Sequence, residues 1–343
     1  MFKQSERQKR IFLNFKNIVK LYLILYLYFL SPSQQIAVVT NLTSSSSSTS
    51  NNPTSDKPLA IEAPPSSSSS NNKAPPTNNK QSQKIKVIRR DPNVDKRDKI
   101  GFTPLISAAL RGKLGEVKRL ISYGANVSAA NNNGATALLC AVQSGHVAVA
   151  ALLLDNDADI KARDRLGVTP LRHAAAYGQL SCVALLLDRG AKIDAVCNNG
   201  FTALNTAAQD GHLAVVELLV KRGADIERGE EFGLTPLMTA AVNNRVDIVR
   251  CLLDNGAKID AKQREGATVL HLASKGGHID VVKLLLDRGA NLRAVMNDGF
   301  NALHVAAFDK SAGIAALLIS RGAIVDAVNN DGLTPLLSAA GQK

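Results

Sequence analysis

The residues best suited to bind a metal ion are three histidines that recur at a fixed spacing. His146, His212 and His278 each follow a glycine and lie 66 residues apart. That spacing corresponds to two of the repeating units described below, and neighbouring helices pack about 8–10 Å apart. A metal ion holds its ligands at about 2 Å, so the three rings cannot share one ion. We therefore predict no metal site and expect each histidine to fix the turn before a helix.

Other patterns that support catalysis are missing from the sequence. No GxSxG, HExxH or GxxxxGK[ST] motif occurs, which excludes the usual signatures of serine hydrolases, zinc proteases and phosphate-binding loops. We expect Glu230 and Glu231 to form a solvated acidic turn. The four cysteines lack CxxC spacing, which argues against zinc and disulfides, and we expect Cys140 and Cys251 to be buried thiols; the set is Cys140, Cys182, Cys197 and Cys251. The sequence thus predicts a protein that is not an enzyme and uses no cofactor.

The elements that carry these residues are internal repeats. A Gly-x-Thr-x-Leu pattern recurs every 33 residues without an insertion, which is the signature of a repeat architecture. The anchor glycines are Gly101, Gly134, Gly167, Gly200, Gly233, Gly266, Gly299 and Gly332. They define seven full units over residues 101–331 and a partial eighth unit over 332–343.

Each unit predicts two short helices. The Thr two residues after the anchor is a good N-cap, as is Asn301 in its place, and Pro often follows at the first helical position. Small residues such as Ala174 and Ala175 allow close packing, and a Gly ends the helix. The second helix carries an apolar stripe at helical spacing, in the fourth unit Leu213, Val216, Leu219 and Val220. Asn244 suits a left-handed helix end, whereas Asp157 replaces a glycine and predicts a strained or frayed end.

On these features the sequence resembles ankyrin-repeat proteins. The 33-residue period, the Thr-Pro-Leu anchor, the Ala pair, Gly-His, the Leu pair and the following Gly-Ala carry the resemblance. It implies an all-α solenoid of stacked helix-turn-helix units with projecting hairpin loops. It also extends back over a half unit at 85–100, which makes the repeat domain 85–343. The family's His after Thr-Pro-Leu remains only as His271 and His304. In the other full units this His is replaced by Ile106, Leu139, Arg172, Asn205 and Met238. These replacements leave open how those units hydrogen-bond to their neighbours.

The N-terminal third differs in composition. Residues 1–33 combine a basic start, an apolar run at 21–30 and small residues, which is the order of a signal peptide. An uncleaved hydrophobic anchor and a fortuitous apolar stretch are the alternatives. Export or membrane anchoring would follow from the first two, whereas the repeats and unpaired cysteines favour the cytoplasm. Residues 34–84, rich in Ser, Asn and Pro, predict a disordered linker. Asn41 and Asn126 match the glycosylation pattern, which matters only on a secretory route.

The positive charge is concentrated before the repeats. Residues 1–99 hold 16 Lys and Arg against 6 Asp and Glu, a net +10, whereas the remaining chain holds 25 against 23, a net +2. A nearly neutral repeat domain makes nucleic acid an improbable partner. The segment 84–99, net +4, leaves one alternative open, in which it contacts nucleic acid or an anionic membrane. Direct membrane contact is otherwise expected only through residues 11–30.

A solenoid offers an extended concave surface to a partner. We therefore predict a monomeric, non-enzymatic scaffold that binds a protein partner there. A further alternative is that the chain is an interaction fragment of a larger enzyme, since it stops after the eighth first helix unless Leu336 and Leu337 form a minimal cap. Arg165, Arg172 and Tyr177 form the preferred patch because Arg and Tyr are frequent interface anchors. The predicted contact residues are Arg165, Arg172, Tyr177, Asn205, Asp210, Glu231, Arg264 and Asp309.

Overall fold

The computed structural model describes residues 84–89 and 91–340, and within them every regular element is an α-helix. We number the seven full repeats from unit 1 (101–133) to unit 7 (299–331). The first helices of successive units are α3 (Pro104–Leu110), α5 (Ala137–Gln143), α7 (Pro170–Ala176), α9 (Ala203–Asp210), α11 (Pro236–Val242), α13 (Val269–Lys275), α15 (Ala302–Phe308) and α17 (Pro335–Ala340). The second helices are α4 (Leu114–Ser122), α6 (Val147–Asp155), α8 (Leu180–Asp188), α10 (Leu213–Lys221), α12 (Val246–Asp254), α14 (Ile279–Asp287) and α16 (Ala312–Ser320).

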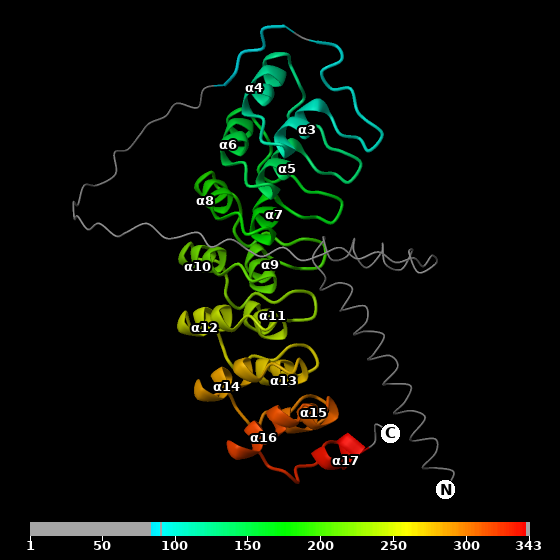
Figure 1. Cartoon of the computed structure of the whole chain (residues 1–343), viewed down its shortest axis with the longest axis vertical. Coiled ribbons are helices and arrows are strands. Elements are labelled where there is room, and N and C mark those ends of the chain that lie inside the picture. Colours follow the sequence, from blue (N-terminus) through cyan, green and yellow to red (C-terminus); the bar gives the residue numbers. More distant parts are fainter. Residues whose placement is uncertain (1–83, 90, 341–343) are drawn as a thin grey trace, which may run out of the picture. The chain divides into compact units, whose positions relative to one another are not determined.

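The helices stack in two columns (Figure 1). First helices form one column, second helices form the other, and the loops between units project beyond the first helices. The predicted all-α repeat solenoid is therefore confirmed. We use "fingertip" for the four residues before each anchor glycine, for example 163–166.

The segments predicted before the repeats are not part of this description. The signal peptide or anchor at 1–33 and almost all of the linker at 34–84 lie outside the described residues. Within the described chain, no helix has both the length and the apolar character needed to cross a bilayer. The prediction of a hydrophobic membrane anchor in the N-terminal segment is corrected accordingly, because no membrane anchor is supported.

The first helices begin where the sequence predicts. Thr103, Thr136, Thr169 and Thr235 adopt extended backbone angles, and each side-chain oxygen accepts a hydrogen bond from the backbone N–H three residues later. Asn301 does the same in unit 7. These bonds satisfy donors that the first helical turn would otherwise leave free. The small cap residue therefore sets the helix start, whichever of the two types is present.

The second helices bury one face, slightly displaced from the predicted stripe. In α10 the buried side chains are Val215, Val216 and Leu219, whereas Leu213 and Val220 are half-buried. The Ala pairs of α3, α7, α9 and α11 are also buried, and Ala174 and Ala175 are both fully inaccessible. The core therefore runs continuously along the stack, and each unit depends on its neighbours for burial.

Three non-glycine residues adopt left-handed backbone angles at helix ends. Asn244 has φ 54° and Asp157 has φ 67°, as their positions in the repeat predict, and Lys310 has φ 57°. At most anchor positions a side chain would also come too close to the next fingertip. Gly134 has φ +80°, and a Cβ atom there would lie 2.9 Å from the backbone nitrogen of Arg165 in the next fingertip. A side chain would thus force neighbouring fingertips apart.

Backbone hydrogen bonds join the fingertips to one another. The last residue before each anchor glycine accepts a bond from the N–H 32 residues later, as in Arg165 N to Asn133 O at 3.0 Å and Asn198 N to Leu166 O at 3.1 Å. The remaining donor–acceptor pairs are Asn132–Ile100, Glu231–Asn199, Arg264–Phe232, Asn297–Glu265 and Asn330–Asp298. The projecting loops therefore form a connected row.

Ion pairs join the second helices on the other side of the stack. An Arg after one helix pairs with the last Asp of the preceding second helix at 2.7–2.8 Å, in Arg189–Asp155, Arg222–Asp188, Arg288–Asp254 and Arg321–Asp287. The series is interrupted between α10 and α12, where Lys221 stands in place of the Asp and Asn255 in place of the Arg. Partly exposed pairs of this kind contribute about 0–1 kcal/mol each, so they supplement the buried core.

Candidate partner-binding surface

The predicted contact residues are distributed over the first helices and the fingertips. We refer to the exposed sides of these two elements together as the first-helix face. Arg165, Glu231, Arg264 and Asp309 are exposed; Arg172, Tyr177 and Asp210 are half-buried; Asn205 is buried. Units 3 and 4 bring Arg172, Tyr177 and Asp210 into one neighbourhood, whereas Arg264 and Asp309 lie in units 5 and 7.

Arg172 connects units 3 and 4. It lies in the first turn of α7, where its Nε donates to Thr206 Oγ1 in α9 at 2.8 Å. Its guanidinium carbon lies 5.8 Å from the centre of the Phe201 ring, within the range of a cation–π interaction. These two contacts therefore hold the Arg172 side chain in place, and it remains partly accessible to a partner. A guanidinium oriented in this way loses little freedom when a partner binds it.

Tyr177 and Asp210 form the polar centre of this neighbourhood. Burial raises the pKa of the Asp210 carboxyl, and electrostatic interaction with His212, Arg172 and Arg245 partly offsets this effect. Burial also raises the pKa of Tyr177, and the nearby Asp210 charge raises it further. Tyr177 therefore remains a neutral phenol at physiological pH. The pair presents a hydroxyl and a poorly hydrated carboxylate, groups that gain from a partner's hydrogen-bond donors.

The Asn205 side chain bonds within the repeat stack and is not accessible at its surface. Its side chain is fully buried, where Oδ1 accepts from Thr202 N at 3.1 Å and Nδ2 donates to Leu234 O of the next unit at 3.5 Å. His271 uses the same repeat position in unit 6 to bond Thr268 N and the Phe300 carbonyl. Asn205 therefore replaces the histidine in its bonding between units. This burial removes Asn205 from the set of predicted partner contacts.

A second polar pair lies further along the first helices. Burial lowers the pKa of Lys275 to about 8, although Asp309 and Glu265 act in the opposite direction. Asp309 is exposed as a residue, but the protein atoms around its carboxyl keep part of the water away and raise its pKa, and Lys275 partly offsets that change. The two groups face one another across units 6 and 7, so Asp309 is already matched by a cation within the chain.

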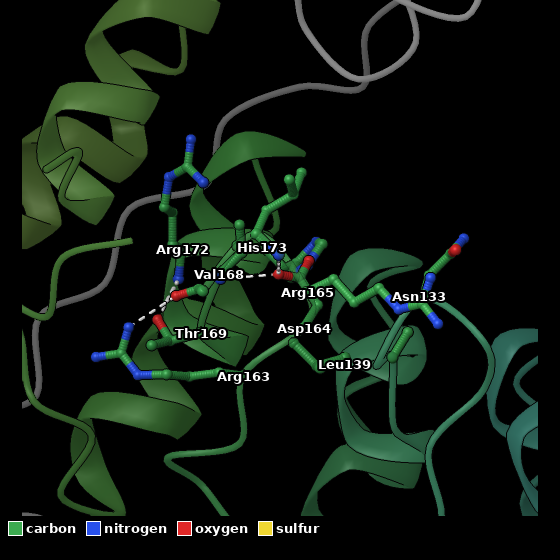
Figure 2. Close-up of polar contacts among 12 residues, drawn as sticks. Asn133, Leu139, Arg163, Asp164, Arg165, Val168, Thr169, Arg172 and His173 are labelled. Carbon is green, nitrogen blue, oxygen red and sulfur yellow. Dashed lines mark hydrogen bonds and ion pairs between the residues drawn. The ribbon is translucent and has the colours of Figure 1, made fainter. Parts of the chain in front are cut away.

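A histidine and an aspartate that the sequence analysis did not single out also meet at the junction of units 2 and 3. Figure 2 shows His173 of α7 directed at Asp164 of the preceding fingertip, with His173 Nε2 and Asp164 Oδ2 separated by 3.0 Å. The other carboxylate oxygen accepts the N–H groups of Leu166 and Val168. Burial would raise the pKa of Asp164, but these hydrogen bonds hold it below the ordinary value. The pair fixes the fingertip that carries Arg165. The available signal was the histidine itself, since the equivalent position in the other units holds Ser, Cys, Thr, Leu or Val.

Arg163 ties that fingertip to the next one. Its Nη1 donates to the carbonyls of Gly167 and Val196 at 2.8 and 2.7 Å. In Figure 2 its guanidinium lies well apart from the Arg165 side chain. The two arginines of one fingertip thus have different roles, because Arg163 is engaged within the stack and Arg165 is exposed.

The expectation of a solvated acidic turn at Glu230 is wrong. Glu230 is only 7% exposed, and its carboxylate accepts the N–H groups of Phe232 and Leu234 at 3.0 Å. Burial raises its pKa, and those hydrogen bonds lower it in part. Glu230 therefore shapes the fingertip from inside, whereas Glu231 is exposed as expected.

The regularly spaced histidines act between units and not only at turns. Each histidine lies just before a second helix. Its Nε2 donates to the carbonyl of the last residue of the first helix in the preceding unit: His146 to Leu110 O at 3.1 Å, and His212 to Ala176 O at 2.9 Å. His278 makes the equivalent bond to Val242 O. The described chain contains no group of three or more His, Cys, Asp or Glu residues arranged to hold a metal ion. Among the cysteines, Cys140 is buried as expected, but Cys251 is only half-buried.

The start of the basic segment 84–99 lies against the array itself. Lys84 pairs with Asp157 at 2.8 Å, and the N–H of Ile85 donates to Asn156 Oδ1 at 2.9 Å. Further along, Ile88 N donates to the Ser122 carbonyl. Unit 2 has Asn156 and Asp157 at these two contacts, where units 3, 4, 6 and 7 have Arg and Gly. The segment also has no aromatic residue on which a base could stack.

These features define a helical repeat solenoid with a connected row of fingertips. Models of ankyrin repeats match residues 77–164, 160–230 and 226–296 in three-copy form, and a single ankyrin repeat matches 298–330. The chain therefore belongs to the ankyrin-repeat family, whose repeats generally mediate protein–protein interactions and are typically non-enzymatic.

A solved structure supports the same assignment. The crystal structure of the human ASB11 ankyrin repeat domain is similar to this chain, with 35% sequence identity and a TM-score of 0.59. The match covers 64% of this chain and 98% of that chain. No curated protein matches the sequence.

Proposed function

We propose that the chain is a monomeric, non-enzymatic scaffold that holds a protein partner on its concave first-helix face. The contact is centred on units 3 and 4, where Arg172, Tyr177 and Asp210 converge. The observation that carries the proposal is the fixed orientation of Arg172, through Thr206 and Phe201, beside a half-buried tyrosine and carboxylate.

The chemistry of this patch suits a protein interface. Arg and Tyr provide large contact area with directed hydrogen bonds, and they are frequent among residues that dominate binding energy. Asp210 lies between cations of its own chain, so its field is partly balanced before a partner arrives. Such a mixed patch favours a polar segment with donors and acceptors over a uniformly charged polymer.

A binding experiment with a matched control tests the proposal. Peptides selected by display against the full chain would be titrated onto the wild type and onto the double variant Arg172→Ala/Tyr177→Ala. The control is Arg119→Ala/Tyr123→Ala, because this pair also has an arginine over a tyrosine ring, at 5.7 Å, but belongs to the second-helix column. We expect the first variant to weaken binding by about 30-fold or more and the control to change it little.

The opposite result would exclude the proposed patch. Equal losses in both variants would indicate a nonspecific effect, and no loss in the first variant would place the contact elsewhere. Light scattering of the same samples tests the monomeric state, and salt-dependent retention on DNA that disappears on deleting 84–99 would favour the basic segment instead.

A further inference from the structure

The positive charge of the described chain is concentrated at one end of the stack. Residues 84–133, which are the segment before the repeats together with unit 1, hold 11 Lys and Arg against 4 Asp and Glu, a net +7. Residues 134–343 hold 21 against 22, a net −1. We call residues 84–133 the basic end, because the rest of the array is close to neutral.

The acids of the basic end have partners within the fold, whereas most of its cations do not. Asp91, Asp95 and Asp98 each accept backbone N–H groups at 2.8–3.0 Å, and Glu116 pairs with Lys113 at 3.7 Å. Within the described chain only Lys84 and Lys113 among these cations form ion pairs. The cations without an ion pair are all exposed: Lys86, Arg89, Lys96, Arg97, Lys99, Arg111, Lys118 and Arg119.

The residues before unit 1 are positioned by contacts with it. Ile88 N donates to the Ser122 carbonyl at 2.9 Å and Asp91 N to the Tyr123 carbonyl at 3.1 Å, both at the C-terminal end of α4. Val94 is buried. Figure 1 shows this segment, in cyan, passing over the end of the stack that α3 and α4 form. The side chains that it exposes therefore belong to the surface of the basic end.

Two large aliphatic side chains lie among the cations. Val87 is 60% exposed and Ile88 is 82% exposed, and Lys86 and Arg89 flank them in the chain. Lys118 lies one helical turn before Ser122 on the same side of α4, and the Ser122 carbonyl accepts the N–H of Ile88. The exposed aliphatic pair thus has cations from its own segment and from α4 beside it.

This combination suits the surface of an anionic bilayer. Each Lys or Arg near such a surface strengthens binding about fivefold, and aliphatic side chains enter the boundary between headgroups and acyl chains. Nucleic acid offers phosphates but no apolar phase for Val87 and Ile88, and residues 84–99 contain no aromatic ring on which a base could stack. The cations also extend from the segment to α4, which matches many separate headgroups better than the few carboxylates of one protein segment.

We propose that the basic end lies against the surface of an anionic lipid bilayer. Val87 and Ile88 enter the boundary below the headgroups, and the exposed cations meet the lipid phosphates. The contact is peripheral and involves no membrane-spanning helix. It goes beyond the proposed function and uses neither Arg172 nor Tyr177, so a protein partner can occupy the first-helix face while the chain is held at a membrane.

Sedimentation of the full chain with vesicles tests the proposal. One set of vesicles is phosphatidylcholine with about 30% phosphatidylserine, and the other is phosphatidylcholine alone. We expect binding to the anionic vesicles only, weakened at least about tenfold when the salt concentration rises from about 50 to 300 mM. Equal binding to both sets of vesicles, or binding to neither, would overturn the proposal.

A first pair of variants tests the aliphatic side chains. Val87→Ser/Ile88→Ser should weaken binding to the anionic vesicles about tenfold, because these side chains no longer enter the apolar boundary. The control is Leu336→Ser/Leu337→Ser, which changes two adjacent leucines, 77% and 52% exposed, outside the basic end. It should change the affinity less than about twofold. Circular dichroism and melting of both variants establish that the stack is intact.

A second pair of variants tests the charges. Lys86→Glu/Arg89→Glu should weaken binding at least about 30-fold, whereas Lys192→Glu/Lys221→Glu, which changes the net charge equally but lies outside the basic end, should weaken it less than about threefold.

The variants also separate this contact from the alternatives. Residues 1–83 are present in every sample, so attachment through them would leave all four variants unchanged and would refute the proposal. If the charge variant alone lost affinity, and lost it equally for vesicles and for duplex DNA, the contact would be purely electrostatic and the proposal would also be wrong. The effect of Arg172→Ala/Tyr177→Ala on display-selected peptides is a separate readout, so either proposal can fail while the other stands.

Discussion

The buried histidine of unit 6 should make stability depend on pH in a way that one substitution abolishes. His271 is 2% exposed, and burial lowers its pKa from 6.5 to about 4, although hydrogen bonds to the Phe300 and Ala294 carbonyls act in the opposite direction. Between these two values the unfolded chain binds a proton that the folded chain excludes. Stability is therefore lost as pH falls through 6.5, and the loss is complete only below about 4.

The size of the effect follows from the same two values. At about pH 5 the unfolded imidazole is almost fully protonated while the folded one is mostly neutral, which costs about 2 kcal/mol relative to neutral pH. The matched variant is His271→Asn, because Asn205 makes the equivalent bonds to Thr202 and Leu234 in unit 4 without a titrating ring.

Urea unfolding at neutral pH and at about pH 5 measures the difference. All other titrating groups are common to both proteins, so the comparison isolates His271. We expect the wild type to lose about 2 kcal/mol more than His271→Asn on acidification. Equal losses in the two proteins would refute the assignment of a neutral, desolvated ring at this position.

Three further substitutions test other parts of the stack. Asn205→Ala should cost about 2–3 kcal/mol, because it leaves the buried Thr202 N–H and the Leu234 carbonyl of the next unit without their partner. Asn205→His should recover most of this stability in urea unfolding. An alanine variant as stable as the wild type would contradict the bonding described. Asp157→Gly should raise the melting temperature, because glycine adopts the left-handed backbone without the strain of about 0.5–1 kcal/mol that aspartate carries there. The ion pair with Lys84 is lost, but it is exposed and contributes little. A lower melting temperature would show that the ion pair contributes more than the strain. Arg222→Ala should cost less than about 1 kcal/mol, and a loss of several kcal/mol would be inconsistent with a partly exposed pair.

The helices were predictable because each of their limits is set by a local rule. Thr103 and its equivalents cap the first helix through a bond three residues away, and glycines or Asn244 end a helix in the left-handed region. These interactions repeat in every unit, so the pattern in the sequence is the pattern in the structure. Even the unusual end at Asp157 followed from its place in the repeat.

The misses concern polar side chains whose hydrogen-bond partners cannot be read from the residue type. Asn205 was predicted to meet a partner, yet it takes the place of a histidine in the stack. Glu230 was predicted to be solvated, because the sequence does not show that its carboxylate folds back onto its own turn. The pair of His173 and Asp164 was overlooked because a fingertip and a helix turn separate the two residues in the chain.

The contact of the basic segment with the array was not predictable for a different reason. Ile85 and Asn156 are 71 residues apart, and the segment before unit 1 does not repeat, so no periodic position marks its partner. Composition showed only its charge. The half-buried state of Cys251 likewise depends on how far the neighbouring helix covers it, which residue type alone does not determine.

Hydrogen exchange of the full chain with and without a display-selected partner peptide tests the central claim most directly. If the partner is held on the first-helix face, exchange should slow in α7 and α9 and in the fingertips at 163–166 and 196–199, while α8 and α10 keep their rates. Protection confined to α8 and α10, or to residues 84–99, would contradict the account.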